Sequence, residues 1–357
     1  MSALTSLAFY LPQFHEIPEN DEWWGKGFTE WENLRAARKW SESHVIRRPI
    51  QPLGEYSLID AATLEQQWAL ASKFEIDGFA VWDYWFGGGR QLLEKPIELV
   101  LRHRLNFKYC LAWANHSWMD KSRNLLLCEQ QYLGHNDYEL YFNRLCQHFE
   151  TDNYIKIDDR PVFIIFNPYE IPDFERFTDQ WRAMAERRGF PGIYLVADRL
   201  WDDDSRIGLV DKYSNSFRFM SRRNKLFINY AKEYFSAQFA IEFGPRNFDF
   251  RRLEKDVIPR NITTNKFVPT AITGWDTTPR HGRRGVVFEN LDPAAFRRQL
   301  DAAAAHFEIA GGSEHVLFLK SWNEWAEGNI LEPDSVFGSQ FLETFKEFRT
   351  CWTAGQG

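Results

Sequence analysis

Short apolar segments alternate with amphipathic stretches along the whole chain. An apolar run of about four to eight residues is typical of a strand buried on both faces, whereas apolar residues recurring every three or four positions indicate a helix. The expected strands are Leu7–Tyr10, Gly78–Tyr84, Phe107–Trp113, Pro161–Phe166, Ile193–Ala197, a less regular one within Lys212–Phe217, Phe267–Thr273 and His315–Trp322. The expected helices are Ala61–Phe74, Pro96–Leu105, Tyr138–Glu150, Asp173–Arg188, Pro293–Ala310 and Phe341–Thr350.

This alternation predicts βα units, and eight of them favour a closed barrel over an open sheet. The fold class is therefore expected to be α/β, a (β/α)8 TIM barrel. Such a barrel needs about 250 residues, and the chain has 357. We expect the surplus in two long loops, Leu11–Ser57 after the first strand and Phe219–Lys266 around the sixth and seventh strands. No repeat, linker or composition shift divides the chain, so residues 1–357 are expected to form a single domain.

Aromatic residues make up 17% of the chain, and 15 of them are Trp. Aromatic packing in a large barrel accounts for part of this, but each buried indole N–H needs an acceptor, so a core rarely uses so many. A cleft lined with flat apolar rings, as in sugar-binding sites, explains the excess better. The net charge of −7 provides no basic field for nucleic acid or an anionic membrane. We therefore expect an oligo- or polysaccharide partner, no nucleic acid and no membrane insertion.

The amino-terminal segment and the cysteines indicate the compartment. The sequence MSALTSLAFYLPQFH lacks the basic and apolar regions of a signal peptide, and no apolar run in the chain approaches transmembrane length. The four cysteines form no CxxC pair, which is typical of reduced thiols. These features predict a cytoplasmic protein, unless a signal has been removed or export follows another route.

Polar and aromatic side chains gather at the carboxyl ends of the expected strands, where TIM-barrel active sites lie. Any one of them could be a cap or turn residue, but together they favour a substrate cleft. The residues expected to bind substrate are Tyr10, His15, Trp24, Asp83, Trp85, Trp113, Asn115, Trp275, Trp322 and Asn323. Other polar residues at these ends are Gln13, His116, Asn167, Glu170, Asp198 and Asp276.

The last strand runs into SWNEWAEG, which contains Glu324 and Glu327. Two carboxylates three residues apart point to opposite faces of a continuing strand, but on a tight turn they share one side. An acid for the leaving oxygen and a base for the nucleophile are the minimum requirement for glycosidic cleavage. We therefore expect Glu324 and Glu327 to be catalytic. The alternative is a solvated turn whose carboxylates cap a helix.

Motifs for metal, phosphate or serine chemistry are missing from the sequence. It contains no HExxH, no Walker loop, no GxGxxG after a strand and no G-x-S-x-G elbow, and His15, His116 and His135 lack ligand spacing. We expect neither a metal nor another cofactor.

Two long motifs resemble a known family. Residues Phe9–Ala37 (FYLPQFHEIPENDEWWGKGFTEWENLRAA) and Lys320–Asp334 (KSWNEWAEGNILEPD) resemble the WbsX-type proteins of bacterial surface-polysaccharide clusters, a group similar to glycoside hydrolase family 99. The resemblance extends over nearly the whole chain. It implies a (β/α)8 fold and relatedness to endo-acting α-mannosidases.

The resemblance also implies roles for the two glutamates. Glu324 would be the base that deprotonates the substrate 2-hydroxyl, whose oxygen then attacks C1 to form a 1,2-anhydro sugar. Glu327 would first protonate the departing oxygen and then activate water, with overall retention of configuration. The implied function is a retaining glycoside hydrolase acting on α-manno- or α-rhamno-configured linkages of a bacterial polysaccharide. Endo action is one option, and the sequence leaves endo versus exo action open.

Three alternatives remain open from the sequence. The first is a glycosyltransferase or transglycosylase in O-antigen or capsule biosynthesis, although a barrel without a nucleotide crevice is a poor sugar-nucleotide transferase. The second is a non-catalytic carbohydrate-binding barrel. In the third, Glu170 is the acid/base and Glu324 a direct nucleophile, which requires carboxyl groups about 5–5.5 Å apart.

Overall fold

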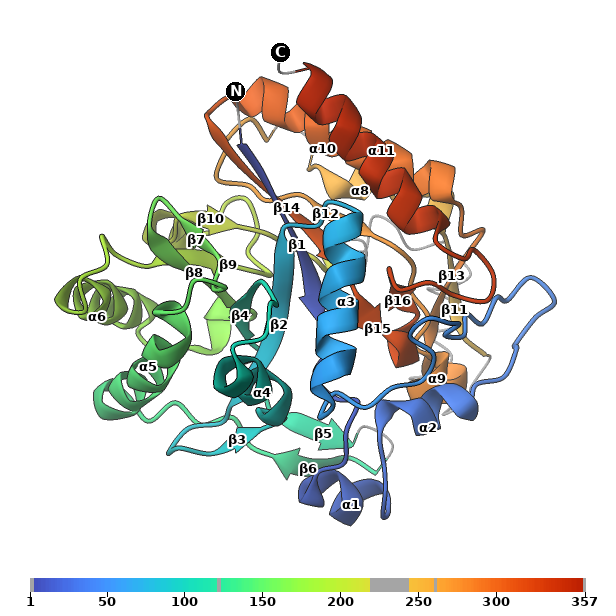
Figure 1. Ribbon diagram of the computed structural model, residues 1–357, viewed down its shortest axis with the longest axis horizontal. Helices are drawn as coiled ribbons and strands as arrows, with labels where there is room; N and C mark the ends of the chain where they lie inside the picture. The colour runs from blue at the N-terminus through green and yellow to red at the C-terminus, as the bar shows by residue number, and fades with distance from the viewer. Residues whose placement is uncertain (1–2, 121–122, 219–243, 260–261, 356–357) are drawn as a thin grey trace.

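The computed structural model describes residues 3–120, 123–218, 244–259 and 262–355 (Figure 1). Within them, eight strands pair in parallel in the order β10-β9-β8-β4-β2-β1-β14-β12. Their bounds are β1 Ala3–Tyr10, β2 Gly78–Trp85, β4 Tyr109–Trp113, β8 Arg160–Ile165, β9 Tyr194–Ala197, β10 Lys212–Tyr213, β12 Thr270–Ile272 and β14 Glu314–Lys320. Each lies within or overlaps an expected strand, so the predicted α/β barrel is confirmed.

A short parallel contact joins β10, the first strand of this order, to the residues that precede β12, the last. Tyr213 bridges Phe267 in parallel, its amide donates to Lys266 O at 2.9 Å, and Val268 N donates to Tyr213 O at 2.8 Å. The Ser214 hydroxyl adds a bond to Val268 O at 3.0 Å. These bonds link β10 to the segment that leads into β12 and close the barrel.

Among the described residues, six helices of nine or more residues lie around the sheet, as Figure 1 shows. They are α3 Ala61–Lys73, α4 Lys95–His103, α5 His135–Phe149, α6 Phe174–Arg187, α10 Pro293–Ala310 and α11 Gln340–Gly355. Two begin with a clear cap: Asp60 accepts from Ala62 N, and Asp292 accepts from Ala294 N ahead of Pro293. Such caps satisfy amides that a helix start leaves free. In the described chain no helix is both long and apolar enough to cross a membrane.

The loop after β1 is partly helical and covers the carboxyl end of the barrel. It contains α1 Pro18–Trp24 and α2 Glu30–Arg35, which lie at the end toward which the β1 arrow points (Figure 1). Short elements at other strand ends are β3 Gln91–Leu92, β5 Trp118–Asp120, β6 Leu125–Cys128, η1 Pro168–Glu170, η2 Ser205–Leu209, α9 Thr278–His281 and η6 Gly282–Arg284. At the opposite end, β7 Lys156–Ile157 forms a hairpin with β8.

The second expected long loop, Phe219–Lys266, is described only in part, because residues 219–243 and 260–261 lie outside the described chain. Its described part contains β11 Arg246–Asp249, η5 Phe250–Arg252 and α8 Glu254–Val257. β11 pairs in parallel with β13 Val286–Glu289. All four cysteines are free, and three of them, Cys110, Cys128 and Cys146, are buried.

Candidate functional site

The candidate site is built on a tight hairpin that follows β14. β15 Asn323–Glu324 pairs with β16 Asn329–Ile330, and the 3-10 helix η7 Trp325–Glu327 connects them. Gly328 ends this turn with φ +65°, and a Cβ there would lie 2.7 Å from Asp276 Cβ. Asp276 N also donates to Glu327 O at 2.6 Å. The turn therefore needs glycine, both for its conformation and for the close approach of the segment after β12.

Glu324 is buried among groups that influence its charge. Its side chain accepts a hydrogen bond from Trp82 Nε1 at 3.1 Å, and the residue is 6% exposed. Burial and the negative charge of Glu327 raise its pKa to about 7, against the opposing charges of Lys320 and Arg280. The two glutamate side chains thus act on each other, as a turn at this spacing allows.

Glu327 is half-buried and forms an ion pair with Arg280 on α9. Arg280 also contacts Glu30 on α2, with Nε 3.1 Å and Nη2 3.0 Å from Glu30 Oε2. Burial alone would raise the pKa of Glu327, but the charge of Arg280, followed by that of Lys320, lowers it. In the free site, therefore, Glu327 binds a proton less tightly than Glu324 does.

Lys320, the last residue of β14, carries a second cation into the site. It is 2% exposed, and its Nζ lies over the rings of Phe9, Trp82, Phe217 and Trp275 at 5.2, 5.7, 4.4 and 5.5 Å. No described residue forms a hydrogen bond or ion pair with this ammonium. Trp82 touches both this ammonium and Glu324, so the two charged groups lie around one indole.

Buried polar contacts fix the hairpin from behind. Asn323 bonds both polar atoms of the Leu11 backbone, at 2.7 and 3.1 Å, and so ties the end of β1 to the turn. Glu332 is 1% exposed and accepts bonds from Gln67 Nε2 at 2.6 Å, Tyr56 OH at 2.8 Å and Trp325 Nε1 at 2.7 Å. Burial raises the pKa of Glu332 to about 7, while these donors oppose the rise. Asn323 and Glu332 are therefore positioned to support the turn.

Several expected substrate residues point to the helix layer instead. Tyr10 OH donates to Gln67 on α3 at 2.7 Å, and Asp83 accepts from Tyr141 at 2.6 Å and Arg144 at 3.0 Å, both on α5. Three expected tryptophans also pack outward. Trp85 stacks on Tyr141 with ring centroids 4.8 Å apart, Trp113 Nε1 donates to Trp85 O, and Trp322 packs against Phe79. The expectation that Tyr10, Asp83 and Trp113 share one cleft with the glutamates is corrected.

The strand alternation explains this correction. Successive side chains point to opposite faces, so when Asp83 and Trp85 face α5, Trp82 and Tyr84 face the barrel mouth. Trp82 bonds Glu324, and the charge of Glu324 acts on Tyr84, whose pKa burial raises first. Sequence reasoning missed both residues, together with Lys320, Arg280 and Glu30. The signal it could have used for Lys320 is a lone charge within the apolar run HVLFLKSW.

The other expected residues have varied surroundings. Asn115 braces a loop, because its amide bonds both Asn167 N and Asn167 O at 2.8 Å. His15 is buried, and burial lowers its pKa to about 4. Trp24 is 43% exposed on α1, with Arg123 over its ring at 5.5 Å. Trp275 lies under Lys320 and against Phe217, with ring centroids 5.7 Å apart, so it belongs to the site's aromatic floor.

The alternative acid Glu170 lies apart from the coupled pair. It is exposed on η1 and accepts a bond from Asn167 Nδ2 at 3.4 Å. Glu327, and not Glu170, is the acidic residue whose charge shifts the pKa of Glu324. In the described ranges, no group of three or more His, Cys, Asp or Glu side chains is placed to hold a metal ion.

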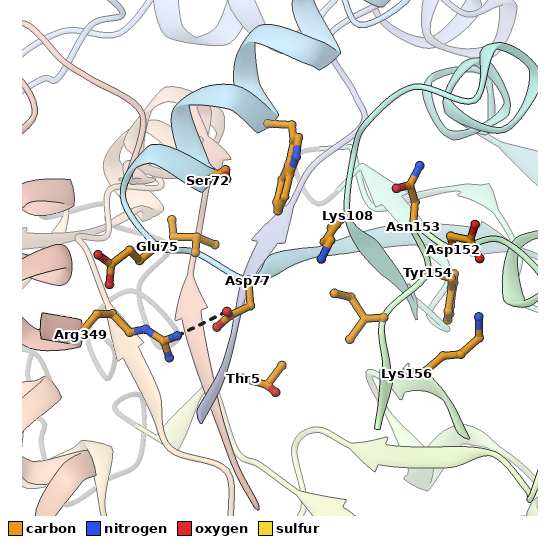
Figure 2. Close-up of a pocket in the computed structure, with 13 residues that line it drawn as sticks. Thr5, Ser72, Glu75, Asp77, Lys108, Asp152, Asn153, Tyr154, Lys156 and Arg349 are labelled. Carbon is orange, nitrogen blue, oxygen red and sulfur yellow. Dashed lines mark hydrogen bonds and ion pairs between the residues drawn. The ribbon is translucent and has the colours of Figure 1, made fainter. Parts of the chain in front are cut away.

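A hollow of about 480 Å³ lies at the other end of the barrel (Figure 2). Thr5 near the start of β1 lines it, as do Asp77 and Lys108 just before β2 and β4. Arg349 on α11 approaches Asp77 within 3.4 Å at its edge. Active sites of TIM-barrel enzymes lie at the carboxyl ends of the strands, so this hollow is not the candidate active site.

Solved structures resemble the chain over most of its length. An endo-α-mannosidase of glycoside hydrolase family 99 from Bacteroides thetaiotaomicron is 13% identical, with a TM-score of 0.58 and coverage of 98% of both chains. A structure described as a glycoside hydrolase-like protein is 16% identical, with a TM-score of 0.58 and coverage of 98% of this chain and 94% of the other. At these identities the likeness establishes the (β/α)8 fold.

Sequence relatives give the family. Two proteins from strains of Xanthomonas campestris pv. campestris, both described as uncharacterized protein WxcX, are 30% identical over 353 residues. The match covers 97% of this chain and 50% of theirs, so the chain spans about half the length of these curated relatives. The family described as Glycosyltransferase WbsX matches residues 6–345. The chain therefore belongs to the WbsX family.

Proposed function

We propose that the protein is a retaining glycoside hydrolase that cleaves α-manno- or α-rhamno-configured linkages within a bacterial polysaccharide. One observation carries the proposal: two electrostatically coupled glutamates, one buried and one half-buried, lie after the last barrel strand and differ in their affinity for a proton. One proton shared by two carboxyl groups supplies an acid and a base at the same time. The described activity of the Bacteroides neighbour, an endo-α-mannosidase, supports this substrate class.

In the proposed first step, the Glu324 carboxylate takes the proton of the 2-hydroxyl and O2 attacks C1. The bond from C1 to the leaving oxygen breaks as Glu327 gives that oxygen its proton. In the second step, the Glu327 carboxylate takes a proton from water, whose oxygen attacks C1. The C1–O2 bond breaks, and O2 regains its proton from Glu324. Two inversions at C1 give net retention.

This mechanism restricts the sugar configuration. O2 must lie opposite the leaving group, and an α-manno or α-rhamno unit meets this condition because its axial 2-hydroxyl is trans to an axial leaving group. An α-gluco unit places O2 on the same side as the leaving group and is not expected to react.

Arg280 determines which glutamate holds the shared proton in the free site. Its ion pair keeps Glu327 ionised, whereas the proposed first step requires the proton on Glu327. We propose that a bound sugar separates Arg280 from Glu327, so that the proton moves from Glu324 to Glu327 before cleavage. If Arg280 stays in place, Glu324 becomes the acid and Glu327 the base. A comparison of sugar and activated aryl leaving groups distinguishes these assignments.

The experiment is a hydrolysis assay on surface polysaccharide from the organism that encodes the protein. New reducing ends should appear with the wild-type protein and not with Glu324→Gln or Glu327→Gln. Failure to release reducing ends from any α-manno- or α-rhamno-containing polysaccharide would contradict the proposal.

A second candidate is glycosyl transfer, which the family's name favours. The same two glutamates would perform it if an acceptor hydroxyl, rather than water, opened the 1,2-anhydro sugar. Adding acceptor oligosaccharides with and without sugar nucleotides tests this. Product that forms only with a sugar nucleotide would favour a transferase over a hydrolase.

A further inference from the structure

The Lys320 side chain is buried in the site, close enough to Glu324 and Glu327 for its charge to lower their pKa values, but it forms no ion pair or hydrogen bond with either. Four aromatic rings lie 4.4 to 5.7 Å from the Lys320 ammonium, and no described residue offers it a hydrogen-bond acceptor. The face of an aromatic ring attracts a cation electrostatically but provides no oxygen or nitrogen atom to accept its N–H groups. The Lys320 nitrogen is not among the fully enclosed polar atoms of the described chain, so it stays open to a bound molecule that supplies oxygen acceptors.

The neighbours of Lys320 limit which oxygen this can be. Trp82 contacts the ammonium with its ring and Glu324 with its N–H, so the acceptor lies close to the Glu324 carboxyl group. The other charged groups around Glu324 are Arg280 on α9, paired with Glu30 of α2, and Glu327 on η7. Arg280 is therefore already occupied by two carboxylates, whereas Lys320 is not.

The charge of Lys320 also needs an explanation. Glycoside cleavage builds positive charge at C1, which a nearby cation would oppose. Lys320 also favours the ionised forms of Glu324 and Glu327, but it assists the bond-breaking step itself only where negative charge develops. In the proposed reaction, that place is the substrate O2 as Glu324 removes its proton.

We propose that Lys320 is a third catalytic residue, whose ammonium binds O2 of the sugar at the cleaved position and stabilises the negative charge that develops there. This inference rests on the proposed participation of O2. It predicts that Lys320 and O2 interact directly, so that the loss of affinity on removing O2 is smaller when Lys320 is absent.

The test is a binding cycle that needs no turnover. Affinities of methyl α-D-mannopyranoside and its 2-deoxy analogue, and of methyl α-L-rhamnopyranoside and its 2-deoxy analogue, are measured by NMR titration for wild-type protein and Lys320→Met. Met keeps an unbranched side chain against the rings. A charge-assisted hydrogen bond is worth about ten- to a hundredfold in affinity, so removing O2 should weaken wild-type binding by about that factor.

In Lys320→Met, removing O2 should weaken binding by a clearly smaller factor than in the wild type, because only the contact of O2 with Glu324 is then lost. The matched control is Lys212→Met, because Lys212 is also a buried strand lysine, but its Nζ donates to Asn265 O at 2.7 Å. This control should keep the full dependence on O2. If Lys320→Met does not fold, Lys320→Gln provides the same comparison.

The outcomes separate the two proposals. An equal loss on removing O2 in wild type and in the Lys320 variant would overturn the role of Lys320 and leave the proposed function standing. If the wild type binds none of the four glycosides, the proposed α-manno or α-rhamno specificity is contradicted, and the role of Lys320 is overturned with it.

Discussion

Glu327→Gln provides the sharpest test of the two glutamate roles. If Glu327 protonates the leaving oxygen, its loss should lower kcat by about 10²- to 10⁴-fold on a natural sugar leaving group. An aryl glycoside with a strongly acidic leaving group needs no protonation, so on that substrate the loss should shrink to less than about tenfold. Glu324→Gln removes the base instead and should be equally inactive on both substrates.

The same variant has a second effect that follows from the structure. Burial and the charge of Glu327 hold the pKa of Glu324 at about 7, above its ordinary 4.5. Gln at 327 removes the charge but not the burial, so the pKa of Glu324 should fall below 7 without reaching 4.5. A fall of one pKa unit would raise the ionised fraction at pH 6 from about one-tenth to about one-half.

The assay is the pH dependence of kcat/KM on the activated aryl glycoside, which reports ionisation in the free enzyme. Its acidic limb marks the base Glu324 and should move to lower pH in Glu327→Gln. An unmoved limb would mean that Glu324 is not the group being titrated. Rescue of Glu324→Gln, and not of Glu327→Gln, by the activated substrate would exchange the two roles.

Three further predictions concern the hairpin and its charges. Gly328→Ala should destabilise the fold by more than about 1 kcal/mol and impair activity, because the new methyl group would lie 2.7 Å from Asp276 Cβ. The control Gly338→Ala also has positive φ but open space around the new methyl group, so it should show only the backbone strain. Chemical denaturation compares the free energies of unfolding of the two variants. Glu332→Gln should cost about 1–3 kcal/mol, since one acceptor oxygen becomes a donor facing other donors, and should also lower kcat. Because the pKa of Glu324 is raised in the folded state, stability from its neutral form is lost as pH rises through about 7, so Glu324→Gln should melt higher than wild type at pH 8 and equally at pH 4.

The barrel was predictable because its strands are buried on both faces. Such strands appear as continuous apolar runs, and these runs are bounded by turn residues and separated by helical periodicity. The strand hardest to predict, β10, is also short, with two residues in the described sheet. The position of the glutamate pair was predictable for a local reason: a spacing of three residues and the glycine that follows confine both side chains to one turn.

The apolar runs did not predict which side chains at the strand ends face the barrel mouth and which face the helices. In a strand buried on both faces, inner and outer positions are equally apolar, so the sequence of β2 does not indicate whether Trp82 or Asp83 faces the mouth. A shift of one residue exchanges the two faces. Arg280 and Glu30 were missed for another reason: they lie 250 residues apart and meet only through the fold.

The outward polar residues nevertheless contribute to the site. Asp83 binds Tyr141 and Arg144 of α5 at the same strand end where the adjacent Trp82 reaches Glu324. Because adjacent strand residues share one backbone, fixing Asp83 against α5 also fixes the indole that donates to Glu324. Polar residues at the strand ends of a barrel are therefore of two kinds. Some face the barrel mouth, and others face the helices and hold the mouth-facing residues in place. Sequence alone assigns both to the same set, and the hydrogen-bond partner of each side chain separates them.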